Sequence, residues 1–179
     1  MRKAQIWVET VVYTLIGLGL IGIVLAFVTP KIQEYRDRSI IEHSISSLNL
    51  MDSKIQEVLQ APLNTRVVEF TLKRGDLYFN AEHDSLYFVL EESNVLYSQP
   101  DIETSLGRIK ILTEQGRKTH RVTLLLNYTI DLDYENDQAI RKYSSAATPY
   151  RFSFTNLGYT DEITGSKRQI VFVKELSGA

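Results

Sequence analysis

The chain has 179 residues, a formal net charge of −2 at pH 7 and no cysteine. This length fits one domain of ordinary size with an appendage, and the near-neutral charge gives no reason to expect nucleic acid or an anionic surface as a partner. The lack of cysteine excludes disulfides and thiolate metal sites, so an extracellular domain would have to be held together by its own hydrophobic core.

An apolar segment of membrane-spanning length lies near the N-terminus. It covers residues 5–30, and Glu9 is the only formal charge inside it. As a helix that rises about 1.5 Å per residue, the uncharged part over 10–30 would span roughly 30 Å, which is the thickness of the hydrocarbon core of a bilayer. We therefore predict a membrane span over 10–30. A carboxylate so close to its start is costly in lipid and needs an explanation.

Two general interpretations of this segment are a secretory signal peptide and a plain membrane anchor. A signal peptide has a shorter apolar region, of about 7–15 residues, and a small-residue cleavage site, whereas Ala26 is followed here by Phe-Val-Thr-Pro. In a plain anchor, Arg2 and Lys3 would stay in the cytoplasm and the C-terminal bulk would lie outside. Glu9 would then lie in the interfacial region and have no role of its own.

The order of residues at the N-terminus resembles that of a type IV pilin precursor. A basic pair is followed by Ala4, Gln5, Glu9 and an uninterrupted apolar helix, and in this order the chain most resembles archaeal pilins with a class III signal peptide. Two positions depart from the commonest pattern of the family. Ala4 stands where glycine is more usual, and Trp7 stands where a small residue is frequent.

The resemblance implies a processing event and an assembly role. In the family a membrane peptidase cuts ahead of the apolar segment. Here the cut would fall between Ala4 and Gln5, so that residues 1–4 are a leader and Glu9 becomes the fifth residue of the mature chain. A buried carboxylate needs a cationic partner, and the new amino terminus of a neighbouring subunit would supply one during assembly.

Three glycines in the apolar segment match a dinucleotide-binding pattern, G-x-G-x-x-G: Gly17, Gly19 and Gly22. That motif needs a preceding strand, a helix that starts at the glycines and an acidic residue about 20 positions later. Because these glycines lie midway through an apolar helix, we interpret the match as chance. Together with Pro30 they lower local helix stability, which would let this part of the helix loosen when it packs in a filament.

The pattern changes to that of an amphipathic helix over residues 31–60. Apolar residues recur mostly at intervals of three or four: Ile32, Tyr35, Ile41, Ile45, Leu48, Met51, Ile55 and Val58. We expect the charged residues, Asp37 among them, on the other faces. Pro62 and Asn64 stop the helix, so the N-terminal helix is predicted to lie within residues 5–62. If it is continuous, it would be roughly 80 Å long at about 1.5 Å per residue. Its apolar stripe is expected to pack on the following domain.

The hydrophobic period falls to two over residues 66–179, which predicts a β-rich head. We predict strands at 68–72, 77–79, 86–90, 109–111, 121–134, 150–154 and 170–176, with a hairpin turn at 81–84 and a polar loop or short helix at 136–147. Strands at this spacing suggest an antiparallel sandwich or barrel. The predicted fold class is α+β: a long N-terminal hydrophobic α-helix as a spine, followed by an antiparallel β-rich head.

No pattern in the sequence indicates catalysis, a metal or a cofactor. The three histidines are widely separated and none has ligand spacing, so we interpret them as structural or surface residues: His43, His83 and His120. Alternating acidic residues at 131, 133, 135 and 137 resemble the first positions of a calcium loop. However, Asn136 replaces the turn glycine and Lys142 replaces the twelfth-position glutamate. We interpret the run as a solvated strand edge and turn.

One modification motif is present in the predicted head. Asn127-Tyr128-Thr129 is an N-x-T sequon, and Asn127 is predicted to point outward because it alternates with the apolar residues of its strand. Glycosylation at Asn127 would fit an archaeal surface filament, although a single sequon often occurs by chance.

The sequence thus leads to two hypotheses about function. The first is a structural subunit of an extracellular type IV pilus-like filament, a helical homopolymer whose apolar helix lies in the cell membrane before assembly. Its partners would be identical subunits, a prepilin peptidase and the pilus assembly machinery, with no nucleic acid. The second is a single-pass membrane-anchored protein with an extracellular β-sandwich binding domain that does not polymerise.

Overall fold

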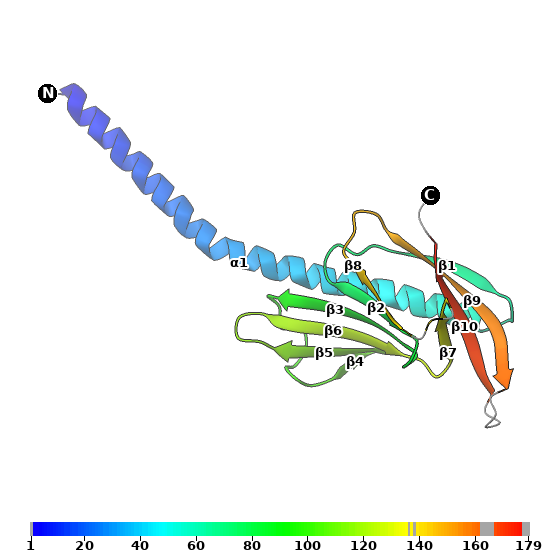
Figure 1. Cartoon of the computed structure of the whole chain (residues 1–179). Coiled ribbons are helices and arrows are strands. Elements are labelled where there is room, and N and C mark those ends of the chain that lie inside the picture. Colours follow the sequence, from blue (N-terminus) through cyan, green and yellow to red (C-terminus); the bar gives the residue numbers. More distant parts are fainter. Residues whose placement is uncertain (1, 136, 138, 162–166, 177–179) are drawn as a thin grey trace.

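The computed structural model describes residues 2–135, 137, 139–161 and 167–176. One long helix, α1 (Arg2–Val58), precedes a head built from β-strands (Figure 1). The predicted α+β fold class, with a long N-terminal helix and an antiparallel β-rich head, is confirmed. Helix α1 ends at Val58, a little before the predicted end.

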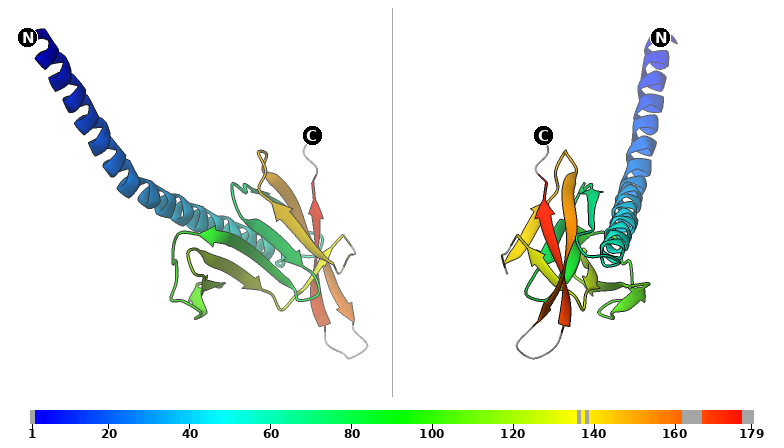
Figure 2. Two further views of the ribbon diagram at one scale, coloured as in Figure 1. Left: turned by 60° about the vertical axis from the view of Figure 1, so that its left-hand side comes forward. Right: turned by 90° about the vertical axis from the view of Figure 1, so that its right-hand side faces the viewer.

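The axis of α1 changes direction about half-way along its length (Figure 1), in the part of the helix that contains Pro30. Proline has no N–H to donate and its ring clashes with the carbonyl four positions earlier, so a bend is expected there. The bend separates two halves with different surroundings. The N-terminal half projects away from the head, and the C-terminal half lies along it (Figure 2).

The head consists of two sheets. In spatial order, the four-stranded sheet contains β1 (Thr65–Phe70), β9 (Tyr150–Asp161), β10 (Lys167–Glu175) and β7 (Asp131–Tyr134). The six-stranded sheet contains, again from one edge to the other, β4 (Thr104–Leu106), β5 (Ile109–Gln115), β6 (His120–Asn127), β3 (Ser85–Ser93), β2 (Asp76–Asn80) and β8 (Ile140–Ser144). Neighbouring strands are antiparallel except β10 and β7, which are parallel.

The buried stripe of α1 and the two sheets share one hydrophobic core. Six helix residues spaced by three or four are buried: Ile41, Ile45, Leu48, Met51, Ile55 and Val58. The predicted stripe was therefore correct from Ile41 onward. It was wrong for Ile32 and Tyr35, which are exposed because they lie beyond the end of the head.

The interpretation of residues 121–134 as a single strand was wrong. Strand β6 ends at Asn127 in the six-stranded sheet, and β7 begins at Asp131 in the four-stranded sheet. Buried Tyr128 and Leu132 continue the alternation through the crossing, so the sequence pattern does not reveal the change of sheet. Asp84, in the predicted hairpin turn, fixes the crossing: its carbonyl accepts from Tyr128 N (2.9 Å) and its carboxylate from Leu132 N (2.9 Å) and Arg168.

Two strands were missed because they carry almost no buried side chains. Strand β8 lies within the polar segment predicted as a loop or short helix, and only Tyr143 on it is buried. All three residues of β4 are exposed. Both strands lie at edges of the six-stranded sheet. An edge strand is paired on one side only and buries few side chains here, so its sequence shows no alternation of apolar and polar residues.

The C-terminal end of α1 is tied to the four-stranded sheet by amide side chains. Buried Asn156 on β9 donates from Nδ2 to the carbonyls of Val58 (2.9 Å) and Ala61 (3.0 Å). Gln169 on β10 donates to the Leu59 carbonyl (3.0 Å). The last carbonyls of a helix have no partner inside it, so these bonds both satisfy the helix end and fix its position on the sheet.

A buried carboxylate ties α1 to the six-stranded sheet at the other end of the head. Asp37 is 2% exposed and accepts from the Arg74 guanidinium, from Asn94 N (2.7 Å) and from Asn94 Nδ2 (2.8 Å). Arg74 also donates to the Glu91 and Glu92 carbonyls at the end of β3. We call these three residues, Asp37, Arg74 and Asn94, the Asp37 clamp. Asp37 was expected on a solvated face, and that expectation was wrong.

Replacing Asp37 tests the clamp. In Asp37→Asn the new amide would face the donors of Asn94 and Arg74, so we expect the unfolding free energy to fall by about 2–3 kcal/mol. The matched control is Glu42→Ala, which removes the exposed 3.0 Å pair with Arg38 and should cost no more than about 1 kcal/mol. Urea unfolding of the full chain in detergent, followed by the far-ultraviolet circular dichroism of the head, measures both. Equal losses would contradict a special role for the clamp.

Candidate functional site

The apolar half of α1 is the largest feature of the molecule left without a partner. From Trp7 to Gln33 every residue is exposed except Gly17, which is half-buried. Helix α1 is long and apolar enough to cross a membrane by length and composition, and its apolar window is not buried inside the chain. Two of its three threonine hydroxyls are satisfied within the helix, since Thr14 donates to the Thr10 carbonyl (2.8 Å) and Thr29 to the Leu25 carbonyl (2.7 Å).

The structure places Ala4, Gln5 and Glu9 in the first turns of α1, at the end farthest from the head (Figure 2). The helix begins at Arg2, so the predicted cleavage point lies within it. Glu9 is exposed. The next charged residue along the chain is Lys31, 22 positions later, which is about 33 Å away at ~1.5 Å per residue. Between Glu9 and Lys31 the sequence therefore contains no cationic side chain.

The predicted sequon is accessible. Asn127 is the last residue of β6, and both Asn127 and Thr129 are exposed, whereas Tyr128 between them is buried. The predicted outward orientation of Asn127 is therefore confirmed. Asn127 lies in the head, far from the Glu9 end of α1, so the structure does not bring the predicted site residues together.

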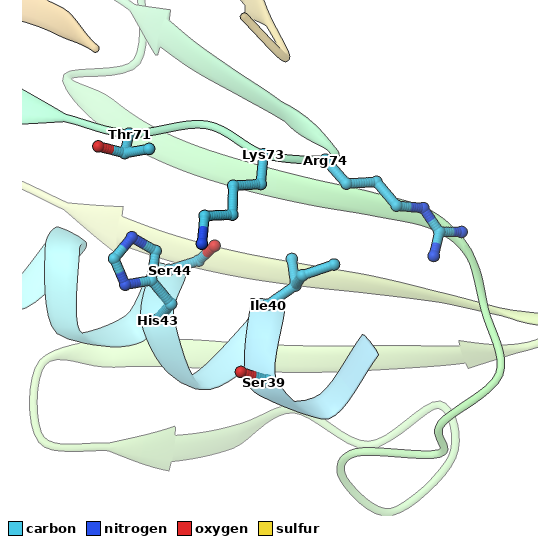
Figure 3. A pocket seen from close by; sticks show the side chains of 7 residues that line it. All are labelled: Ser39, Ile40, His43, Ser44, Thr71, Lys73 and Arg74. Atoms are coloured by element: carbon cyan, nitrogen blue, oxygen red, sulfur yellow. The ribbon is translucent and has the colours of Figure 1, made fainter. Parts of the chain in front are cut away.

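A small pocket lies between α1 and the segment joining β1 to β2 (Figure 3). Its volume is about 120 Å³ and it is lined by Ser39, Ile40, His43, Ser44, Thr71, Lys73 and Arg74. The Lys73 amine points toward Ser44 and His43 (Figure 3). Small-molecule sites are usually about 300–1,000 Å³ and mostly apolar, and the seven lining residues include no carboxylate that could act with His43 as an acid–base pair. The pocket therefore gives no argument for catalysis.

The remaining polar residues singled out from the sequence lie apart from one another. His83 lies in the β2–β3 turn with Glu82 at 3.9 Å, and His120 begins β6 with a buried Nδ1. Asp131 and Asp133 lie on β7, an edge strand, and Glu135 is exposed in the turn that follows. The predicted edge and turn are present, but the two aspartates are half-buried rather than solvated. Asn136 lies outside the described residues. Among the described residues, no three His, Cys, Asp or Glu side chains come together to hold a metal ion.

A second polar cluster, not predicted from the sequence, lies where α1 crosses the six-stranded sheet. Asp52 is 8% exposed and its Oδ1 lies 3.4 Å from Arg108 Nη1. The Arg108 guanidinium lies 5.4 Å from the centroid of the Tyr128 ring. Burial, followed by the charge of Asp52 and a hydrogen bond to it, raises the pKa of the Tyr128 hydroxyl. The cluster packs helix against sheet.

The sequence did contain a signal for both buried carboxylates. Asp37 lies four positions before Ile41, and Asp52 lies four positions after Leu48, so both fall on the apolar stripe of α1. The spacing was disregarded because carboxylates are generally expected to face solvent. That expectation fails here because Arg74 and Arg108 reach the stripe from segments that only the fold brings close.

Comparison of the chain with protein-family models, with curated proteins and with solved structures finds no match. The family resemblance of the N-terminus therefore depends on its own residues alone.

The buried tyrosines give a pH-dependent prediction. Burial raises the pKa of Tyr128, Tyr134 and Tyr143, with a further contribution at Tyr143 from its hydrogen bond with Tyr134. The pKa of each of these tyrosines is higher in the folded state than its value of about 10 in the unfolded state. The folded state therefore has its full stability relative to the unfolded state below about pH 10 and loses stability as the pH rises above that value. We therefore expect the unfolding free energy to fall steeply above about pH 10.

Tyr128→Phe should make this alkaline loss smaller, because it removes a buried hydroxyl whose ionisation the fold opposes. Tyr159→Phe, at a ring that is 64% exposed, is the matched control and should leave the pH profile unchanged. Chemical denaturation between pH 7 and 11 measures both variants, and identical profiles would refute the prediction.

Proposed function

We propose that the chain is a structural subunit of an extracellular type IV pilus-like filament, assembled through its N-terminal hydrophobic helix with the head exposed for adhesion or surface contact. The observation that carries the proposal is the exposed apolar half of α1, which belongs to the same continuous helix as the core of the head.

An exposed apolar helix must be covered by something. Burying one Val, Leu, Ile or Phe side chain is worth about 1.5–3 kcal/mol, and the side chains from Trp7 to Val28 include many such residues at 37–73% exposure. A bilayer covers them all equally well. Helices of identical subunits can cover them too once the subunits leave the membrane, and this second arrangement forms a filament with a helical core.

The rigid attachment of the head favours the filament. The Asp37 clamp and the Asn156 bonds hold α1 to both sheets, and no linker separates the apolar half from the docked half. Packing the helices in a regular array would therefore also place the heads in a regular array on the outside. A membrane-tethered binding domain gains nothing from such a connection.

Glu9 is proposed to set the register between subunits. Its carboxylate is costly in an apolar core unless it meets a positive charge. Cleavage between Ala4 and Gln5 would create an amino terminus at the same end of each neighbouring helix, which is the cation that the chain otherwise lacks near Glu9.

The proposal implies a sequence of locations and partners. The chain would first lie in the cell membrane with its N-terminus in the cytoplasm, where a prepilin peptidase cuts it, and would then be drawn by the pilus assembly machinery into a homopolymer at the cell surface. In this role the chain is not an enzyme. Exposed Asn127 would be available for glycosylation, which the intact mass of the surface form would reveal.

The alternative is a single-pass membrane protein whose β-rich head binds a partner and never polymerises. The exposed apolar helix fits this function equally well. The filament subunit and the anchored binding protein differ in the mature N-terminus and in the role of Glu9.

The first experiment reads the N-terminus of the mature chain. Mass spectrometry of protein recovered from the cell surface is expected to find Gln5 as the first residue. Retention of Met1, or a start beyond Ala26, would overturn the proposal and favour the anchored protein or a cleaved signal peptide.

The second experiment replaces Glu9 in cells. Glu9→Ala and Glu9→Gln should both be processed normally and yet lower filament yield at least about tenfold, because one lost charge pairing of about 1.4 kcal/mol already changes an assembly equilibrium tenfold. Glu34→Ala, which removes the exposed 2.7 Å pair with Lys31, is the control and should assemble normally. Electron microscopy of sheared surface material measures filament yield, and unchanged filaments in both Glu9 variants would refute the register role.

A further inference from the structure

The head begins very close to the end of the apolar segment. The Asp37 clamp lies seven positions after Pro30, about 10 Å along the helix at ~1.5 Å per residue. Gln33 and Arg36 of α1 already share a surface hollow with Glu92 and Thr119 of the head. With the apolar half of α1 in a bilayer, this end of the head would face the lipid headgroups, which form a layer several ångströms thick on each side of the hydrocarbon core.

We call this end of the head and the adjoining helix the proximal rim. It comprises residues 31–38 of α1, 73–74 between β1 and β2, 91–96 at the end of β3, and 116–119 between β5 and β6. These segments contain seven basic and four acidic residues, a formal charge of +3. The whole chain carries −2, so the rest of it carries −5. The positive charge is thus concentrated on the side that faces the membrane.

More of the basic than of the acidic residues of the rim are exposed and free of ion pairs within the chain. The Asp37 carboxylate is buried in its clamp, Glu34 pairs with Lys31, and Glu91 pairs with Arg121 at 3.0 Å. Only the fourth acidic residue, Glu92, is exposed and without an ion pair among the described residues. Four basic side chains of the rim are exposed, and within the described part of the chain none of them forms an ion pair: Arg36, Lys73, Arg117 and Lys118. The free charge of the rim is therefore mostly positive.

Aromatic and apolar side chains accompany these charges. Tyr35 is 74% exposed and Leu96 is 44% exposed, and the two line one hollow with Lys31. Tyrosine is enriched at membrane–water interfaces, where its ring meets the acyl boundary and its hydroxyl meets water. An exposed tyrosine beside unpaired basic residues matches a lipid surface better than open water.

We propose that the proximal rim binds the anionic headgroups of the bilayer that holds α1. This inference rests on the part of the proposed function that places α1 in a membrane and on no later step. Bound in this way, the head lies against the membrane surface.

The test uses the full chain reconstituted in nanodiscs. Because the chain has no cysteine, Gln115→Cys beside the β5–β6 turn gives a single labelling site at the rim, and Leu157→Cys on β9 gives a distal one. Energy transfer from each label to a headgroup-labelled lipid is measured in phosphatidylcholine alone and with 30% phosphatidylglycerol. We expect transfer from the rim label to rise in the anionic discs and transfer from the distal label to stay the same or fall.

Salt and charge variants identify the cause. The rise should disappear in 1 M salt, where the Debye length is about 3 Å. Each basic residue near an anionic surface changes the ratio of bound to free rim roughly fivefold, so Arg117→Gln with Lys118→Gln should lower that ratio roughly 25-fold. Arg66→Gln with Arg141→Gln, which removes two charges from exposed pairs elsewhere on the head, is the matched control and should have little effect. Arg36→Gln, at an exposed residue that lines the rim hollow, is a second, single-charge rim variant and should lower the ratio roughly fivefold.

Equal transfer in the two lipids, or equal effects of the rim and control variants, would overturn the proposal. The nanodisc experiment needs neither cleavage nor polymerisation. Retention of Met1 would therefore refute the filament and leave the rim proposal standing, a start beyond Ala26 would remove both, and a failed rim test would leave the filament proposal intact.

Discussion

The rest of the structure depends on the need to cover one apolar helical surface. The N-terminal half of α1 satisfies its backbone within itself and exposes its side chains on all sides, which is what a bilayer demands of a spanning segment. The C-terminal half is covered on one side by two sheets. The same helix therefore belongs to two environments, and Pro30 lies where one gives way to the other. Any function of the head must be carried out at a short, fixed distance from whatever covers the apolar half.

That distance is fixed by polar contacts more than by the core. The buried stripe from Ile41 to Val58 would tolerate sliding, because apolar contact has little direction. The Asp37 clamp and the Asn156 bonds do not tolerate sliding, since each requires particular donors and acceptors at hydrogen-bond distance. One lies at each end of the docked half of α1. The head and the docked half thus move as one body, and displacement of the apolar half in the direction of the helix axis must carry the head along.

Much of this fold could be predicted because its signals are periodic. The uncharged run over 10–30, the stripe from Ile41 and the alternation on β3, β6 and β9 all follow from burial on one side. The sequence does not show where a strand changes sheets, since Tyr128 and Leu132 keep the alternation across the gap. Nor does it show β4 and β8, whose side chains are nearly all exposed. The buried Asp37 and the positive rim were missed for a related reason: both depend on arginines and lysines that only the fold brings together, and the net charge of −2 conceals the local excess.

The weak points of α1 show where the helix could adapt under the proposed change of its cover from lipid to protein. The docked half is held at both ends, so a change of curvature there would cost hydrogen bonds of the Asp37 clamp. The exposed half contains Gly17, Gly19 and Gly22, whose missing side chains leave open space around the backbone, and Pro30, which removes one backbone hydrogen bond. Glycine and proline lower helix stability by about 1 and 3 kcal/mol relative to alanine. Bending or local loosening would therefore fall between residues 17 and 30, after Glu9 and before the head, so that the docking of the head and the register proposed for Glu9 would both survive it.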